Sequence, residues 1–258
     1  MRRSFDMIGD VAIIEARTKK EEQELVKQIL SVAPRVKTIL KKESDTRGLY
    51  RLRKYHIVYK NQEKVKQSGL GSTETIHIEH GCRFKVDIRK AYFSPREGTI
   101  RSTLADLVHP GERVLVMFSG VGTLPIRIAK KVDCDVVGVD VNPAAYRYGL
   151  ENVKLNKVQD RVKLFHQNIR LFHAKKFDRI VMPLGISAYM FFDVALKLLK
   201  KGGVIHVYGW GERKHPCQEL EGHVAKAAGK RKWEVIGQRI VNPYSPSGKK
   251  VCLDVKIY

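Results

Sequence analysis

Residues 113–142 read RVLVMFSGVGTLPIRIAKKVDCDVVGVDVN, and this stretch decides the fold. The apolar run 114–118 predicts a buried parallel strand, and the glycines of 119–122 predict a tight turn after it. Residues 124–131 have helical spacing and end in two lysines, which the last turn of a helix favours. Residues 136–139 predict the next strand, with Asp140 at its end. A carboxylate about 20 residues after the glycines can hold the two hydroxyls of a ribose. The unit indicates a cofactor that contains adenosine.

The residues around the turn favour one class of cofactor. A dinucleotide fingerprint needs a third glycine where this chain has Pro125, so NAD is disfavoured. A phosphate-binding loop needs Gly-Lys-Ser/Thr, whereas Gly122 is followed by Thr-Leu-Pro. S-adenosylmethionine has no phosphate and needs only a close backbone approach at Gly120 and Gly122 and an acid for the ribose. We therefore expect S-adenosylmethionine; the alternative is a Rossmann-like unit with an empty crevice.

The charge of the chain indicates a polyanionic partner. Among its 258 residues, 49 are Lys or Arg and 27 are Asp or Glu, which gives a formal net charge of +22. Nucleic acid is the first candidate and an anionic membrane the second, and a lysine-rich thermophilic or high-salt surface is the structural alternative. The absence of a transmembrane run or signal peptide pattern leads us to expect a cytoplasmic protein that does not bind a membrane. The four cysteines show no C-x-x-C spacing, so we expect no metal site and no disulfide framework.

The alternation of strand and helix patterns after residue 76 predicts an α/β fold. We expect a Rossmann-like class I methyltransferase sheet, parallel except for an antiparallel closing hairpin, over residues 76–258. The expected strands are 114–118, 136–139, 162–166, 177–182 and 204–208, with the hairpin at 235–241 and 251–257. The expected helices are 99–108, 124–131, 144–155, 188–199 (stopped by Lys-Lys-Gly-Gly) and 218–228, and a further hairpin spans 75–79 and 84–88.

Residues 1–75 predict a separate, small α+β module that contacts RNA. We expect strands at 8–14 and 36–40, a helix at 20–32 and a loop at 60–73. Basic residues alternate with aromatic residues over 50–59, a composition that suits RNA because rings stack on bases and cations meet phosphates. The expected RNA-binding residues are Arg51, Arg53, Lys54 and Tyr55. The alternative is an edge strand whose aromatic side chains fill a core.

Three segments together resemble one family. They read HGCRFKVDIRKAYFSPR (80–96), MFSGVGTLPIRIAKK (117–131) and VVGVDVNPAAYRYGLENVKLNKVQDRV (136–162). They are similar to archaeal and eukaryotic tRNA guanine-37 N1-methyltransferases and their sister enzymes, the wybutosine-pathway aminocarboxypropyl transferases. The resemblance extends from about Ile8 to Tyr258. It implies an S-adenosylmethionine-dependent tRNA methyltransferase acting on guanosine at or near position 37, with another structured RNA as the alternative partner.

The expected cofactor site combines strand ends with this resemblance. Phe118 and Ile169 would enclose the adenine ring, and Asn168 would pair with its edge. By resemblance, Tyr92, Phe93 and Ser94 would line the methionine end, and Asp140 would hold the ribose. The full set of expected cofactor-binding residues is Tyr92, Phe93, Ser94, Phe118, Gly120, Gly122, Asp140, Val141, Asn168, Ile169 and Pro183; the expected catalytic residues are Arg96 and Pro183.

The chain departs from the family at the positions that carry its chemistry. The family's motif-one acid falls at Val116, its catalytic glutamate at Ile100, and its Asn-Leu-Pro at residues 183–185, which read Pro-Leu-Gly. Methylation of guanine N1 requires removal of a proton. The remaining candidates for this step are Asp87, Glu97 and the strand end at 206–208. Either another residue serves, or the product comes from aminocarboxypropyl transfer, or the chain is a catalytically degenerate paralogue that binds RNA.

Overall fold

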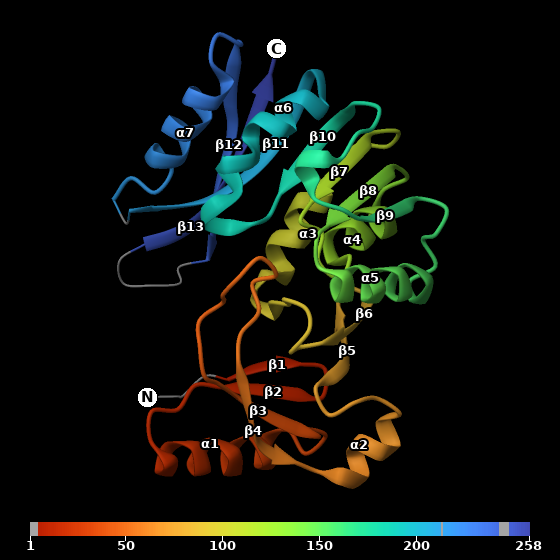
Figure 1. The fold of residues 1–258 in the computed structure, drawn as a ribbon, viewed down its shortest axis with the longest axis vertical. Coiled ribbons are helices and arrows are strands. Elements are labelled where there is room, and N and C mark those ends of the chain that lie inside the picture. The colour runs from red at the N-terminus through yellow and green to blue at the C-terminus, as the bar shows by residue number, and fades with distance from the viewer. Residues whose placement is uncertain (1–4, 213, 243–247) are drawn as a thin grey trace.

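The structure, a computed structural model, describes residues 5–212, 214–242 and 248–258. It contains a small N-terminal sheet, a large sheet and a two-stranded hairpin between them (Figure 1). The large sheet has the order β12-β13-β11-β10-β7-β8-β9, and its β7 to β11 run parallel. β12 and β13 are antiparallel and close one edge. The expected fold class is therefore confirmed; the boundary expected near residue 75 stays a prediction.

The N-terminal sheet has the order β1-β2-β3-β4. Leu25 and Ile29 of the first helix pack on it with Ile14 and Ile39. The single strand expected over 8–14 is wrong, because Gly9 has a φ of +55° and turns the chain between β1 and β2. The elements of this part are β1 (Asp6–Ile8), β2 (Val11–Ile14), α1 (Lys19–Val32), β3 (Thr38–Lys42), β4 (Tyr55–Lys60) and α2 (Gln62–Ser68).

The loop expected over residues 60–73 is also wrong, because it contains α2. Asn61 caps this helix by accepting a hydrogen bond from the Lys64 N–H, and Gly69 ends it in the left-handed conformation. These are ordinary helix-cap signals on a polar, two-turn segment. The helix has no buried residue, so hydrophobic periodicity could not indicate it.

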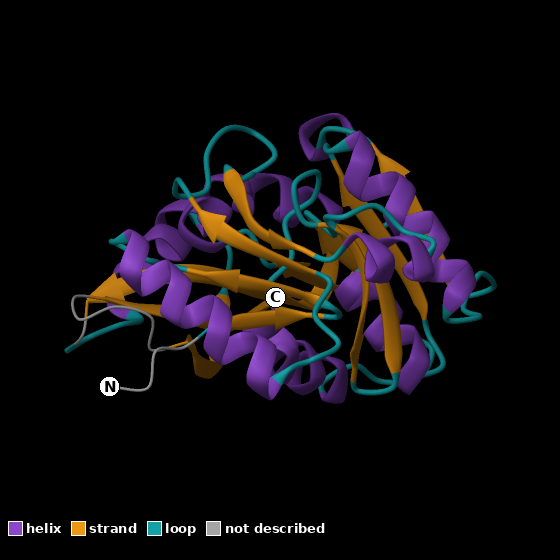
Figure 2. Ribbon diagram, turned by 90° about the horizontal axis from the view of Figure 1, so that it is seen from below, coloured by secondary structure: helices purple, strands orange, loops and turns teal. Residues whose placement is uncertain are grey.

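Helices cover both faces of the large sheet, as Figure 2 shows from below. One core lies under α3, α4 and α5, and the other under α6 and α7. No helix within the described ranges is long and apolar enough to span a membrane. The elements are α3 (Gly98–Asp106), β7 (Arg113–Met117), α4 (Thr123–Lys131), β8 (Asp135–Asp140), α5 (Pro143–Leu155), β9 (Val162–His166), β10 (Phe177–Met182), α6 (Phe192–Leu198), β11 (Leu199–Glu212), α7 (Gln218–Ala228), β12 (Trp233–Asn242) and β13 (Gly248–Ile257), with 3-10 turns η1 (Pro95–Glu97), η2 (Ile169–Leu171) and η3 (Gly185–Phe191).

The helix expected over 188–199 is only partly present. Its first part is the 3-10 turn η3, and α6 begins at Phe192. The expected stop signal at 200–203 lies inside β11, where Leu199 already pairs with Phe177. These residues therefore pair in the sheet, although local sequence signals predict that they end a helix.

A hairpin formed by β5 (Glu74–Glu79) and β6 (Cys82–Asp87) connects the two sheets. It turns at His80 and Gly81, as expected, and both residues have a positive φ. Phe84 anchors it in the core beneath α3 and α4. The hairpin leads into residues 92–96, so its docking sets the position of that loop.

Candidate functional site

The glycine turn after β7 lies at the carboxyl edge of the large sheet. Gly120 has a φ of +56°, and a Cβ added there would meet only the Tyr92 carbonyl oxygen, at 3.9 Å. Its backbone therefore faces open space that a ligand can approach. Phe118 has a φ of +59°, which is rare for an aromatic residue and marks a site held by its surroundings. Its ring packs edge-on against Phe191 at a centroid distance of 5.0 Å.

Asp140 joins this turn to the end of β8. Its two carboxylate oxygens accept hydrogen bonds from the Gly120 N–H at 2.7 Å and the Asn142 N–H at 2.9 Å. Burial raises the pKa of Asp140 above its usual 3.8, although these backbone hydrogen bonds favour the charged form. Each oxygen retains a lone pair, which suits it to accept hydrogen bonds from a pair of hydroxyls.

Arg101 holds the loop 92–96 against the β5–β6 hairpin. Its guanidinium forms two hydrogen bonds with the Glu79 carboxylate, at 2.7 and 2.6 Å, and donates a third to the Ser94 carbonyl at 2.9 Å. Such a two-point pair fixes both orientation and distance. Arg96, in the same loop, bonds to Asp6 of β1 at 2.7 Å. The loop is thus tied to the β5–β6 hairpin through Arg101 and Glu79, and to the N-terminal sheet through Arg96 and Asp6.

Two cavities meet at this loop. The smaller, of about 70 Å³, extends from the loop to the glycine turn and to Pro183 after β10. The larger, of about 220 Å³, lies between the N-terminal sheet and the large sheet. Tyr92, Phe93, Ser94 and Glu97 line both cavities. Burial raises the pKa of Tyr92 to about 12, so its hydroxyl stays protonated as a donor near neutral pH.

The structure brings most of the expected cofactor residues together. Tyr92, Phe93, Ser94, Phe118, Gly120 and Pro183 line the smaller cavity. Gly122 begins α4 beside them, and Val141 follows Asp140. Arg96, by contrast, lines the larger cavity. Asn168 and Ile169, in the segment after β9, fit their expected roles less well. Asn168 is exposed and its Oδ1 accepts from the Arg170 N–H at 3.0 Å, while Ile169 is only 4% exposed and packs in the core.

Three of the four expected RNA-binding residues, Arg51, Arg53 and Tyr55, line the larger cavity. Arg51 donates to the Leu184 carbonyl and lies over the Tyr92 ring at 5.4 Å. Arg53 lines the larger cavity, and its buried Nε has no hydrogen-bond partner among the described residues. Tyr55 lines that cavity too and packs against the core cluster that contains Ile8, as the core-filling alternative requires. Lys54 is exposed.

Sequence reasoning missed several residues of the larger cavity. Lys42 of β3, Trp210 of β11 and Lys250 of β13 line it with Arg51 and Arg53. They come from strands far apart in the chain, so no local spacing indicates that they meet. Lysines on strands are common, and nothing in their immediate sequence distinguishes Lys42 or Lys250.

Comparison with known proteins gives a consistent result. A family model described as the TRM5/TYW2 methyltransferase domain matches residues 75–236. The chain is 37% identical to tRNA (guanine(37)-N(1))-methyltransferase Trm5b of Pyrococcus abyssi, with 98% of this chain and 74% of that protein covered. It superposes on a complex of aTrm5 and tRNALeu with a TM-score of 0.86 at 31% identity, covering 99% of this chain and 72% of that one. It also superposes on Pyrococcus horikoshii TYW2 in complex with MeSAdo, with a TM-score of 0.82 at 27% identity, covering 99% and 91%.

Proposed function

This chain belongs to the TRM5/TYW2 methyltransferase family, and we propose that it methylates guanosine at or near position 37 of tRNA with S-adenosylmethionine as the donor. One observation carries the proposal: the small cavity at the glycine turn and the larger cavity between the sheets share the wall formed by Tyr92, Phe93, Ser94 and Glu97. A cofactor in the first and a nucleotide in the second would meet at this wall.

The smaller cavity and the strand ends beside it suit S-adenosylmethionine. Asp140 would hold the ribose hydroxyls, and Gly120 leaves its backbone open toward the ligand. Tyr92, Ser94 and Pro183 would surround the methionine end. When bound, the cofactor supplies an electrophilic carbon on its sulfonium. The residues of the shared wall then contribute mainly by holding the target base close to that carbon and in line with it.

The larger cavity suits a nucleotide turned out of an RNA loop. Lys42, Arg51, Arg53, Arg96 and Lys250 line it, against the two acids Asp6 and Glu97. This excess of positive charge favours phosphate, and Tyr55, Tyr92 and Trp210 offer ring surfaces for a base. Binding a single extruded base gives the enzyme access to its edge. The buried Nε–H of Arg53 has no hydrogen-bond partner within the described part of the chain, so Arg53 is the side chain best placed to donate a hydrogen bond to the nucleotide.

A second candidate function is transfer of the aminocarboxypropyl group from the same cofactor. Residues 183–185 read Pro-Leu-Gly where the methyltransferases that the chain resembles have Asn-Leu-Pro. The chain therefore lacks the asparagine amide that would hold a target nitrogen, and this favours the second candidate. Pro183 lines the small cavity and Arg51 holds the Leu184 carbonyl, so this segment is ordered by contacts of its own. A third candidate is an RNA-binding paralogue without catalysis.

Nucleoside mass spectrometry separates the three. Unmodified tRNA transcripts are incubated with the protein and S-adenosylmethionine, digested and compared with transcripts that carry adenosine at position 37. We expect a methyl-sized gain on guanosine that the adenosine transcript lacks. An aminocarboxypropyl-sized gain would favour the second candidate. No new nucleoside, with tRNA binding intact, would favour the third.

A further inference from the structure

We propose that Glu97 is the proton acceptor of the transfer reaction and that Lys250 positions its carboxylate; this rests on the proposed function. A guanine nitrogen that gains an alkyl group must lose the proton it carries. The acceptor has to lie where the target base and the reactive end of the cofactor meet. Among the described residues, Glu97 is the carboxylate that lines both cavities at that junction.

The local chain geometry explains why Glu97 reaches the junction. It is the last residue of η1 and the residue before α3, so its side chain leaves the chain where the loop 92–96 ends. Ile100, three residues later, is only 7% exposed and packs in the core with Phe84 and Leu104. A carboxylate at position 100 would have to displace that packing. Position 97 offers a carboxylate to the cavities without disturbing the core.

Lys250 gives this carboxylate a fixed place. Its Nζ donates to Glu97 Oε1 at 2.6 Å, and the same Nζ lies 5.0 Å from the centre of the Tyr208 ring. Arg101 Nη1 is 3.9 Å from Glu97 Oε2. The charged and titratable groups that face Glu97 are therefore Lys250, Arg101, Tyr92 and Tyr208. Lys250 and Arg101 therefore fix the carboxylate from its two oxygens, Oε1 and Oε2 respectively.

The other candidate proton acceptors do not lie where the two cavities meet. Asp6 lines the larger cavity but bonds to Arg96 at 2.7 Å, away from the smaller one. Asp87 lines neither cavity, and its Oδ1 accepts from the Thr73 hydroxyl at 2.8 Å. His206 is fully buried between Asp254, at 2.6 Å, and Arg179, at 2.8 Å. Neither Asp87 nor His206 can reach a base in these cavities.

In the proposed step, alkyl transfer and proton removal occur on the same base. The ring nitrogen of the base forms a bond to the transferred carbon, while the electron pair of the broken C–S bond stays on sulfur. The electron pair of the N–H bond stays with the ring, and the proton forms an O–H bond at Glu97. If the target atom is carbon, the same carboxylate takes the proton from the C–H bond. Solvent then removes the proton from Glu97 between turnovers.

The test compares Glu97→Gln and Glu97→Ala with the wild type in single-turnover reactions on tRNA across pH. We expect each variant to be at least about 100-fold slower, with the acid limb of the pH profile lost. Added formate should restore part of the rate to Glu97→Ala, because it can occupy the vacated space, whereas chloride should not. Calorimetry should show S-adenosylmethionine and tRNA binding within about twofold of wild type. A purely structural role for Glu97 would produce neither formate rescue nor a change in the pH profile.

Glu151→Gln is the matched control. Glu151 also pairs with a lysine, 2.9 Å from Lys85 Nζ, but neither residue lines either cavity, so its rate and pH profile should equal those of wild type. Lys250→Met should slow the reaction, and Lys250→Arg should restore most of the rate. A wild-type rate in Glu97→Gln would overturn the assignment of Glu97 as proton acceptor but would leave the proposed function unaffected. No modified nucleoside from the wild type would overturn the proposed function and, with it, the assignment.

Discussion

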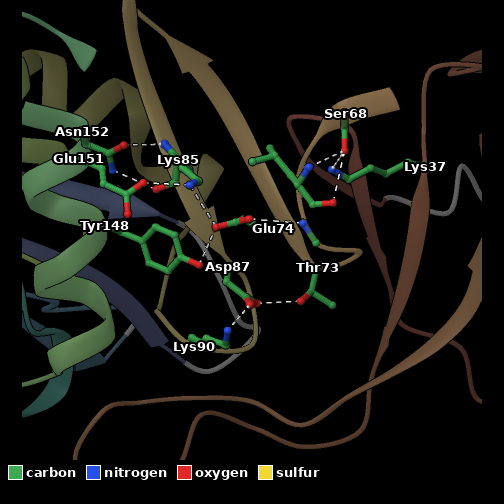
Figure 3. Close-up of polar contacts among 12 residues, drawn as sticks. Lys37, Ser68, Thr73, Glu74, Lys85, Asp87, Lys90, Tyr148, Glu151 and Asn152 are labelled. Atoms are coloured by element: carbon green, nitrogen blue, oxygen red, sulfur yellow. Dashed lines mark hydrogen bonds and ion pairs between the residues drawn. The ribbon is translucent and has the colours of Figure 1, made fainter. Parts of the chain in front are cut away.

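The side-chain amide of Asn152 pairs with the backbone of Lys85 as a neighbouring strand would. The Lys85 N–H donates to Asn152 Oδ1 at 2.7 Å, and Asn152 Nδ2 donates to the Lys85 carbonyl at 3.0 Å (Figure 3). The same Nδ2 also donates to the Val121 carbonyl in the glycine turn, at 3.0 Å. One turn later, Asn156 pairs in the same way with Arg83. Helix α5 thereby fixes hairpin β5–β6 to the turn that forms the cofactor site.

Asn152→Ala should destabilise the protein by roughly 3 kcal/mol. Asn152 is fully buried, and its removal leaves three backbone groups without a partner, of which each buried one costs about 1–3 kcal/mol. Urea unfolding followed by circular dichroism measures the change. Glu151→Ala is the control, because its ion pair with Lys85 is exposed and should contribute less than about 1 kcal/mol. Equal losses in both variants would contradict a special role for Asn152.

These asparagines show what the sequence could and could not predict. The buried parallel strands are short, continuous runs of apolar residues, and these runs located them in the sequence. The motif around Asn152 supported the resemblance to a family. The structural role of Asn152 depends on Lys85, however, which lies 67 residues away, and no local sequence pattern indicates that the two residues meet. The same holds for the pair of Glu97 and Lys250, which are 153 residues apart. Local signals failed where tertiary pairing dominates, as at residues 200–203 inside β11.

Acid should destabilise the protein through a buried pair of β11 and β13. Burial opposes ionisation of Asp254, but hydrogen bonds from His206 and Arg239 outweigh it and lower the pKa of Asp254 to about 2. The stabilisation that the lowered pKa of Asp254 provides is present above pH 3.8, the usual pKa of an aspartate, and is lost as the pH falls toward 2. Burial also lowers the pKa of His206 below 6.5, so the unfolded state gains a proton first and stability begins to fall below that pH. Urea unfolding over a pH series should show both losses.

Asp254→Asn isolates the lower part of that profile. Removal of one partner of a buried charge pair costs roughly 3–5 kcal/mol at neutral pH, and the loss between pH 3.8 and 2 should disappear. Asp193→Asn is the control: this exposed carboxylate lies 3.6 Å from Arg170, and the substitution should change stability by less than about 0.5 kcal/mol. A full acid transition retained in Asp254→Asn would show that other carboxylates cause it.

Asp140→Ala should weaken S-adenosylmethionine binding by about tenfold or more, because hydrogen bonds from the ribose to a charged group are worth about 1.5–3 kcal/mol. Affinity for the cofactor should also fall as the pH drops through the raised pKa of Asp140, since its charged form is the better acceptor. Titration calorimetry at several pH values measures both effects. Asp135→Ala tests the opposite end of the same strand, where the exposed carboxylate should not affect binding. Equal affinity in Asp140→Ala and wild type would exclude Asp140 from the ribose site.

The double variant Arg53→Ala/Lys54→Ala should bind tRNA more weakly and with a smaller salt dependence. Each cation that meets a phosphate contributes about 0.7–0.9 to the slope of log affinity against log salt, so a loss of about 1 to 2 is expected. Arg53 lines the larger cavity and Lys54 is exposed beside it in sequence. Lys20→Ala/Lys27→Ala removes the same charge from α1, which lies on the far side of the N-terminal sheet from the large sheet (Figure 1). Filter binding over a salt series should give this control the wild-type slope. If the two double variants lose slope equally, the RNA responds to net charge rather than to this cavity.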